Sequence, residues 1–322
     1  MSRWCLVVLL AVACAGSVGR VLGEDKKLTI AVIPKGTTHE FWKTVHAGAE
    51  DAAKELGVDI VWKGPLREDD REEQIKVVED MITRGVDGIA LAPLDDTALR
   101  APVATAAASG IPVVIFDSDL KSDKHISFVA TDNHAGGKIG GDYLAKLLGG
   151  KGKVIMLRYQ EGSGSTGNRE RGFLDAIASY KDIQVVSANQ YAGVTTETAY
   201  KASENLLAPL KTADGKLSVD GIFCPNEASA FGMLRALQDG GLAGKVHFVG
   251  FDSSSKLIEA LRKGEMDALV LQNPRHMGYL AVKTIVQHLR GQAVEKRIDT
   301  GVRLITRDDL EKPDVKQLLG LP

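Results

Sequence analysis

The chain has 322 residues, of which 44% are hydrophobic, 25% are charged and 5% are aromatic, and its formal net charge is −2. These values are typical of globular proteins, and the length predicts about two domains. The nearly balanced charge gives no indication of binding to nucleic acid or to an anionic membrane surface.

The chain opens with a segment that has the features of a secretory signal, residues 1–23. Arg3 precedes an apolar stretch from Leu6 to Ala13, which is too short to cross a bilayer. Residues 21–23 resemble a signal peptidase site. Residues 11–14 form an imperfect lipobox, so a lipid anchor at Cys14 is an alternative to a free protein. Both alternatives predict export, and we expect the protein in the periplasm.

Removal of residues 1–23 would leave a single cysteine. It would also remove two of the 40 basic residues and none of the 42 acidic ones, so the mature net charge would be 38 − 42 = −4. Cys224 then has no partner for an internal disulfide. Its apolar neighbours Ile222 and Phe223 predict that the thiol is buried and unreactive.

Strand and helix patterns alternate from residue 28 onward, and repeated strand–helix units predict parallel sheets covered by helices on both faces. The pattern begins again after Asp132, so we predict two such sheets. Predicted strands lie at 28–33, 58–62, 86–92, 112–116, 153–157, 183–187, 219–224 and 246–250. Predicted helices lie at 41–56, 69–84, 135–148, 169–180, 196–209 and 227–239.

Four apolar runs end in a polar side chain, namely Asp117, Asn226, Asp252 and Gln272. Ligands of open α/β sheets lie just beyond the carboxyl ends of the strands. Carboxylates and carboxamides can each form two hydrogen bonds in a plane, which suits the vicinal hydroxyls of a sugar or polyol. The alternative is that these side chains cap helices. Gln272 is a poor cap, and Pro274 can begin the next helix.

Two aromatic residues follow the first predicted strand. Phe41 lies on the apolar stripe of its helix and is expected in the core, whereas Trp42 lies about 100° around the helix from it. An indole offers a flat apolar face for the C–H groups of a sugar, so we favour Trp42 as a stacking platform.

Several motifs point to enzymes or cofactors, but each is incomplete. Residues 162–167 match G-x-G-x-x-G, but residues 187–190, at the end of the next strand, include no acid for a ribose hydroxyl. We favour a mobile glycine-rich loop at the mouth of a cleft. His39 lacks the second histidine of a zinc protease helix, because position 43 is Lys43. The sequence therefore predicts no enzyme, no metal and no cofactor.

Other short segments are typical of one protein family when they occur in this order. They are 41–42 (FW), 116–117 (FD), 130–133 (ATDN), 136–138 (GGK), 169–173 (RERGF), 226–227 (NE), 234–237 (LRAL), 249–252 (VGFD) and Gln272. On these segments the chain resembles the type I periplasmic sugar-binding proteins, most closely the ribose-binding branch, over about residues 28–305.

The resemblance implies a set of ligand contacts. Hydrogen bonds to the sugar would come from Asp117, Arg169, Asn226, Asp252 and Gln272, and Phe41 and Trp42 would pack on its ring. His39 stands where the ribose branch has an amide that contacts the sugar, and Ser118 stands where it has a second arginine. Ala192 falls near another aromatic contact of that branch. Loss of the arginine would open volume for a pyranose, a polyol or a larger substituent.

The resemblance also implies the architecture: an α/β fold of two doubly wound parallel-sheet lobes joined by a three-segment hinge. The expected crossings lie near 131–132, 272–273 and 300–301. The N-terminal lobe would comprise 24–131 plus 273–300, and the C-terminal lobe 132–272 plus 301–322. Ligand contacts from both lobes would favour closure of the hinge.

These patterns predict an exported receptor that captures a monosaccharide or related polyol by hinge closure and delivers it to the permease of an ABC importer. The alternative is a sensory module that presents the ligand to a chemoreceptor or membrane kinase. A sugar-responsive repressor core shares this fold, but here the first strand directly follows an apolar signal. We expect a monomer that binds no nucleic acid.

Overall fold

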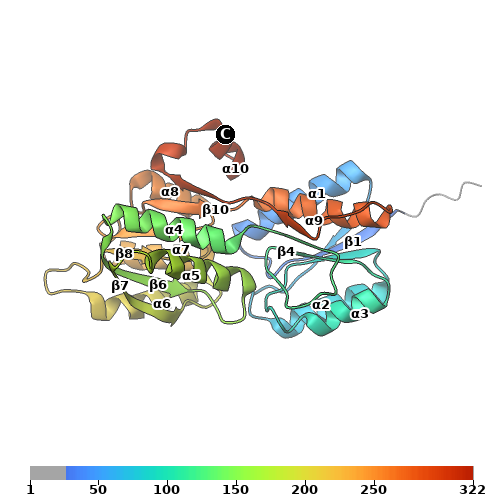
Figure 1. Ribbon diagram of the computed structural model, residues 1–322, viewed down its shortest axis with the longest axis horizontal. Coiled ribbons are helices and arrows are strands. Elements are labelled where there is room, and N and C mark those ends of the chain that lie inside the picture. Colours follow the sequence, from blue (N-terminus) through green and yellow to red (C-terminus); the bar gives the residue numbers. More distant parts are fainter. Residues whose placement is uncertain (1–26, 322) are drawn as a thin grey trace, which may run out of the picture.

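The computed structural model describes residues 27–321, which form two α/β lobes side by side (Figure 1). The predicted signal segment and Cys14 lie outside the described residues. None of the helices within 27–321 combines the length and the apolar character needed to cross a membrane.

The first lobe contains a parallel sheet with the strand order β11-β5-β4-β3-β1-β2. Its strands are β1 (Thr29–Ile33), β2 (Asp59–Trp62), β3 (Gly88–Leu91), β4 (Val113–Phe116), β5 (Ser127–Ala130) and β11 (Arg297–Asp299). Its helices are α1 (Glu40–Leu56), α2 (Arg71–Arg84), α3 (Arg100–Ala108) and α9 (Pro274–Leu289). One apolar cluster joins the sheet to α1 and α9, and another joins it to α2 and α3, so the sheet is covered on both faces.

The second lobe repeats this order as β12-β10-β9-β8-β6-β7, with β12 antiparallel to β10 and the other pairs parallel. Its strands are β6 (Lys151–Arg158), β7 (Asp182–Tyr191), β8 (Gly221–Phe223), β9 (His247–Phe251), β10 (Ala268–Leu271) and β12 (Arg303–Thr306). Its helices are α4 (Asn133–Leu147), α5 (Gly164–Ile177), α6 (Thr196–Leu207), α7 (Glu227–Asp239), α8 (Ser255–Lys263) and α10 (Pro313–Leu319), with short 3₁₀ turns at Ala208–Leu210 and Arg307–Asp309. The predicted fold class is thereby confirmed.

The chain passes between the two sheets three times, once between β5 and α4, once between β10 and α9, and once between β11 and β12. The equivalent strand orders make β4 of the first lobe the counterpart of β9 in the second, and β5 the counterpart of β10. Residues that follow these strands therefore occupy matching places in the two lobes.

Glycines and polar caps set the ends of helices at the predicted places. Gly57 ends α1 and Gly85 ends α2, both in the left-handed conformation that a glycine adopts without steric cost. Asp70 begins α2 by accepting a hydrogen bond from the Glu73 amide.

A close helix crossing fixes the position of α5. A Cβ atom added to Gly137 of α4 would lie 1.9 Å from the Arg169 carbonyl oxygen, and one added to Gly172 would lie 2.0 Å from the His134 carbonyl oxygen. Only glycine permits this approach of α4 to α5, which places the Arg169 backbone at the end of the sheet.

Candidate functional site

A cavity lies between the lobes at the carboxyl ends of both sheets, with about 320 Å³ of space among its walls, part of which is open to solvent. Eight of the nine predicted site residues line it: His39, Phe41, Trp42, Asp117, Arg169, Asn226, Asp252 and Gln272. Ser118 is not among the lining residues. The cavity is also lined by Lys35, Glu68, Tyr159, Ser165, Thr166 and Glu227.

Asp117 and Asp252 occupy equivalent positions, directly after β4 and β9. Each backbone amide donates to a carbonyl of the neighbouring strand, Asp117 to Val129 (3.0 Å) and Asp252 to Val270 (2.8 Å). Both residues have a positive φ, 60° and 67°, and among residues 27–321 they are the only non-glycine residues that do. This conformation costs an L-residue about 1–2 kcal/mol. Such strain is concentrated at functional sites, where it aims a side chain that packing alone would not place.

The Asp117 carboxylate is paired with a buried cation from its own lobe. Lys35, just after β1, has its Nζ 3.3 Å from Asp117 Oδ2 and also donates to Ser165 Oγ (2.9 Å) and Ser163 Oγ (3.3 Å) of the second lobe. The lysine has 2% of its surface exposed. Lys35 therefore links the Asp117 carboxylate of the first lobe to two serine hydroxyls of the second.

The Asp252 carboxylate lies within a network of the second lobe. Gln272 Nε2 donates to its Oδ1 at 2.7 Å, the Glu227 amide donates to its Oδ2 at 3.2 Å, and Arg169 Nη1 lies 3.5 Å from Oδ2. Burial raises the pKa of Asp252 despite these partners. A ligand hydroxyl that donates to this carboxylate would favour its ionised form.

Arg169 is held in place on several sides. Its Nε donates to Asn133 Oδ1 at 2.8 Å, its Nη1 donates to the Pro225 carbonyl oxygen at 3.0 Å, and its guanidinium lies 4.0 Å from the centre of the Phe251 ring. The planar fork is thus oriented before any ligand binds.

The capping alternatives raised by the sequence are resolved residue by residue. Asn226 lines the cavity and also caps a helix, because its Oδ1 accepts a hydrogen bond from the Ser229 amide at the start of α7. Ser254 caps α8, which frees Asp252 from that role, and Asn273 caps α9 in place of Gln272.

The two aromatic side chains form one wall of the cavity. Phe41 and Trp42 meet edge to face with ring centres 4.9 Å apart, and Trp42 meets Phe116 in the same way at 6.3 Å. Trp42 Nε1 donates to Glu68 Oε1 at 2.7 Å, which fixes the tilt of the indole. Trp42 also belongs to the apolar core of the first lobe, so it serves as both core and wall.

Glu68 was not predicted from the sequence, yet it organises this wall. Besides Trp42, it accepts hydrogen bonds from His39 Nδ1 (2.8 Å) and, across the cleft, from the Tyr159 hydroxyl (2.8 Å). Burial opposes ionisation of both Glu68 and His39, but their mutual hydrogen bond and charge outweigh it, so the pKa of Glu68 is lowered and that of His39 is raised. They form a buried ion pair.

Two carboxylates cap helices of the opposite lobe. Glu227, the first residue of α7, accepts from the Glu40 and Phe41 amides at the N-terminus of α1 (3.2 and 3.0 Å). In return Glu40 accepts from the Ser255 amide and hydroxyl at the N-terminus of α8 (3.0 and 3.1 Å). α1 has no side-chain cap of its own, so Glu227 of the opposite lobe supplies one.

The glycine-rich segment at 162–167 is seated against the first lobe. The Asp96 amide donates to the Gly162 carbonyl oxygen (2.9 Å), and the Ser165 amide donates to Ser118 Oγ (3.0 Å). Ser118 therefore positions this segment, and it is fully buried. A cation stands beside Asp117 all the same, because Lys35 supplies one from another strand end.

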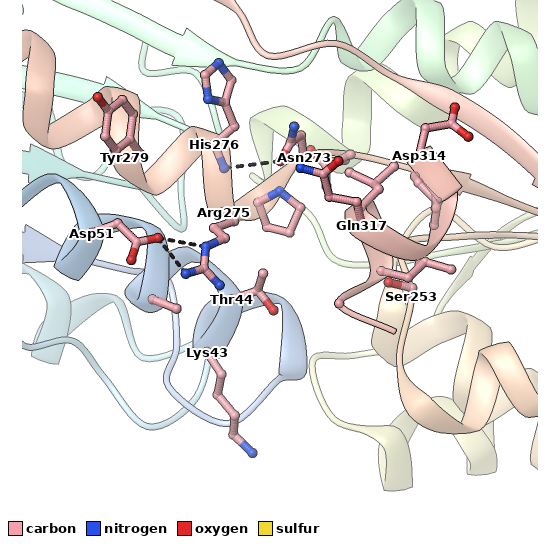
Figure 2. A pocket seen from close by; sticks show the side chains of 17 residues that line it. Lys43, Thr44, Asp51, Ser253, Asn273, Arg275, His276, Tyr279, Asp314 and Gln317 are labelled. Carbon is pink, nitrogen blue, oxygen red and sulfur yellow. Dashed lines mark hydrogen bonds and ion pairs between the residues drawn. The ribbon is translucent and has the colours of Figure 1, made fainter. Parts of the chain in front are cut away.

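A larger groove of about 1870 Å³ lies beside the second crossing, between α1, the start of α9, and α10 (Figure 2). Its charged side chains are spread along the walls, and Arg275 is paired with Asp51 at 2.7 Å. Only Gln272 is shared with the set of four strand-end residues. The smaller cavity, where the polar strand ends converge, is therefore the candidate site.

The remaining cysteine is accounted for by the core. Cys224 is buried, as predicted, and burial raises the pKa of its thiol. Within residues 27–321, no group of three or more His, Cys, Asp or Glu side chains is arranged to hold a metal ion.

Comparison with known proteins assigns the family. The family described as periplasmic binding protein domain matches residues 30–293. The chain belongs to this family. It is 32% identical over 299 residues to the ribose import binding protein of Haemophilus influenzae, covering 93% of this chain and 96% of the relative.

Solved structures agree with this assignment. A carbohydrate transporter solute-binding protein from Agrobacterium radiobacter, in complex with D-arabinose, has a TM-score of 0.86 at 33% identity and covers 91% of this chain and 99% of its own. An ABC transporter solute-binding protein from Agrobacterium vitis, with bound D-fucose, has a TM-score of 0.84 at 36% identity and covers 89% and 98%. The type I periplasmic binding protein fold expected from the sequence is confirmed.

Proposed function

We propose that the protein is an exported receptor that captures a monosaccharide or related polyol between its lobes and delivers it to the permease of an ABC importer. It acts by binding and carries out no reaction of its own. The observation that carries this proposal is the pair of equivalent aspartates, Asp117 and Asp252, which are strained at the ends of β4 and β9 and line one cavity between the lobes.

The chemistry of the cavity suits a hydroxyl-rich ligand. Several hydroxyls can pair at once with the carboxylates of Asp117 and Asp252 and with the side-chain amides of Asn226 and Gln272. The wall formed by Phe41 and Trp42 can pack against the C–H groups of a sugar ring. Buried polar groups of this kind select strongly, because a ligand that lacks a hydroxyl leaves one of them unpaired.

Closure of the lobes couples binding to delivery. The moving bodies would be 24–131 plus 273–300 and 132–272 plus 301–322, with the three crossings as hinge. The cross-lobe bonds of Lys35, Tyr159, Glu40 and Glu227 support a closed state that is stabilised further when a ligand bridges the two aspartates. The sequence features of residues 1–23 place this receptor in the periplasm.

Titration calorimetry of the mature protein with D-ribose, D-arabinose and D-fucose tests the proposal. We expect saturable heat for at least one sugar, and loss of that heat in Asp252→Ala with the fold retained by circular dichroism. The matched control is Asp314→Ala, an exposed carboxylate on α10, which should bind as the wild type. Absence of heat for every sugar would refute the proposal.

A further inference from the structure

Two polar atoms that face the cavity have no hydrogen-bond partner: Gln272 Oε1 and Thr166 Oγ1. Their residues are 4% and 3% exposed. The other unpaired buried side-chain atoms within residues 27–321 belong to His125 and Ser127, which do not line the cavity. An unpaired buried polar atom costs about 1–3 kcal/mol, so two in one cavity indicate partners that a ligand supplies.

The two residues flank the contacts between Arg169 and Asp252 in different ways. Thr166 is the third residue of α5 and precedes Arg169 by three positions, so both side chains lie on one face of the helix. Arg169 Nη1 lies 3.5 Å from Asp252 Oδ2, and Gln272 Nε2 donates to Asp252 Oδ1. Thr166, Arg169, Asp252 and Gln272 all line the same cavity, so one ligand can contact all four.

The chemistry of Gln272 limits what the ligand can be. Its Nε2 donates to a carboxylate, so a flipped amide would turn its carbonyl oxygen toward that negative charge. The free atom is thus an acceptor and requires a donor from the ligand. A hydroxyl group provides one, whereas a carboxylate or phosphate oxygen does not.

The charged side chains around the cavity also disfavour an anionic ligand. Four carboxylates line it, those of Glu68, Asp117, Glu227 and Asp252. The three cationic side chains of the lining already have anionic partners: Lys35 with Asp117, His39 with Glu68, and Arg169 with Asp252. An added anion would be buried in this cavity without an unpaired cation to offset its desolvation.

We propose that Thr166 also contacts the ligand directly, by pairing with a hydroxyl of a neutral sugar beside the bond already expected from Gln272, and that the cavity excludes sugar acids and sugar phosphates. This inference rests on the proposed function and adds to it a specificity-determining residue and the charge class of the ligand.

The test compares Thr166→Val with the wild type by calorimetry, using whichever of D-ribose, D-arabinose and D-fucose binds most tightly. Valine keeps the shape and removes the hydroxyl, so we expect a Kd roughly 10-fold weaker. Thr166→Ser should restore most of the affinity. Thr83→Val, an exposed threonine on α2, is the matched control and should not change the Kd.

Monodeoxy analogues of the same sugar identify the hydroxyl. The analogue that lacks the hydroxyl bound by Thr166 should bind the wild type weakly. Its Kd should not weaken further in Thr166→Val, because the missing hydroxyl and the substitution remove the same hydrogen bond. The aldonate of that sugar should bind at least 100-fold more weakly than the sugar itself. Wild-type binding that Thr166→Val leaves unchanged, or an aldonate that binds as well as the sugar, would overturn the inference while the proposed function stands. If the wild type binds none of the three sugars, both fail.

Discussion

The hydrogen bond from Tyr159 to Glu68 offers a direct test of closure, because it joins the lobes and is buried at both ends. The Tyr159 hydroxyl lies 2.8 Å from Glu68 Oε2, and Tyr159 is fully buried. In an open form both groups would be solvated. Tyr159→Phe would leave a carboxylate oxygen unpaired in the closed form only, at a cost of about 1.5–3 kcal/mol. We therefore expect a Kd roughly 10- to 100-fold weaker, without a matching loss of thermal stability.

Calorimetry with the best-binding sugar measures the change in affinity, and a thermal melt of the ligand-free protein measures stability. The matched control is Tyr180→Phe, whose hydroxyl lies 3.4 Å from Asp142 Oδ1 within the second lobe. That variant should bind as the wild type, because its bond does not cross the cleft. If Tyr159→Phe also bound with the wild-type Kd, the bridge would contribute nothing to closure and the reasoning would be refuted.

Three further predictions concern the backbone, the pH dependence and the helix crossing. Asp252→Gly and Asp252→Ala should both abolish sugar binding. Because φ at position 252 is 67°, the glycine variant should be more stable to unfolding than the alanine variant by about 1 kcal/mol. Equal stability of the two variants would exclude backbone strain at this position. Burial between the lobes raises the pKa of Glu227 to about 7 from 4.5, so Glu227 should take up a proton when the lobes close at a pH between these values. The affinity for sugar should therefore fall as the pH rises from 5 to 8. Glu227→Gln should flatten this profile, and a slope as steep as that of the wild type would contradict the assignment. Gly137→Ala should destabilise the second lobe by about 1–3 kcal/mol and weaken binding through Arg169, whereas a wild-type melting curve would argue against the tight crossing.

The sequence was sufficient for the fold because most strands are continuous apolar runs bounded by turns. β3 and β4, for example, are buried along their whole length, as parallel strands covered on both faces should be. β5 (Ser127–Ala130) escaped prediction, and so did the short edge strands β11 and β12. They span Arg297–Asp299 and Arg303–Thr306 and mix charged with apolar residues, so their pairing depends on where the chain crosses between lobes.

The rule that ligands lie beyond the carboxyl ends of the strands found the site residues that each lobe positions without help from the other. Lys35 and Tyr159 follow β1 and β6 just as Asp117 follows β4, so the same rule applied to every strand would have found them. A lysine and a tyrosine carry less signal than an aspartate, because both commonly lie at the surface.

Glu68 and Glu227 could not be found in this way. Glu68 lies in a loop six residues beyond the end of β2, and Glu227 reads as an ordinary first-turn acid of α7. Their partners belong to distant segments, and several come from the opposite lobe, so only the closed arrangement gives these residues a role. The hydrogen bond from the Ser165 amide to Ser118 could not be predicted for the same reason, since it joins the glycine-rich segment to the opposite lobe.

The most direct test of the central claim is a crystal structure of the mature protein with its best-binding sugar. We expect one neutral sugar in the cavity, with hydrogen bonds from its hydroxyl groups to Asp117 of the first lobe and Asp252 of the second. A sugar held by one lobe only, or bound in the groove between α1 and α10, would contradict it.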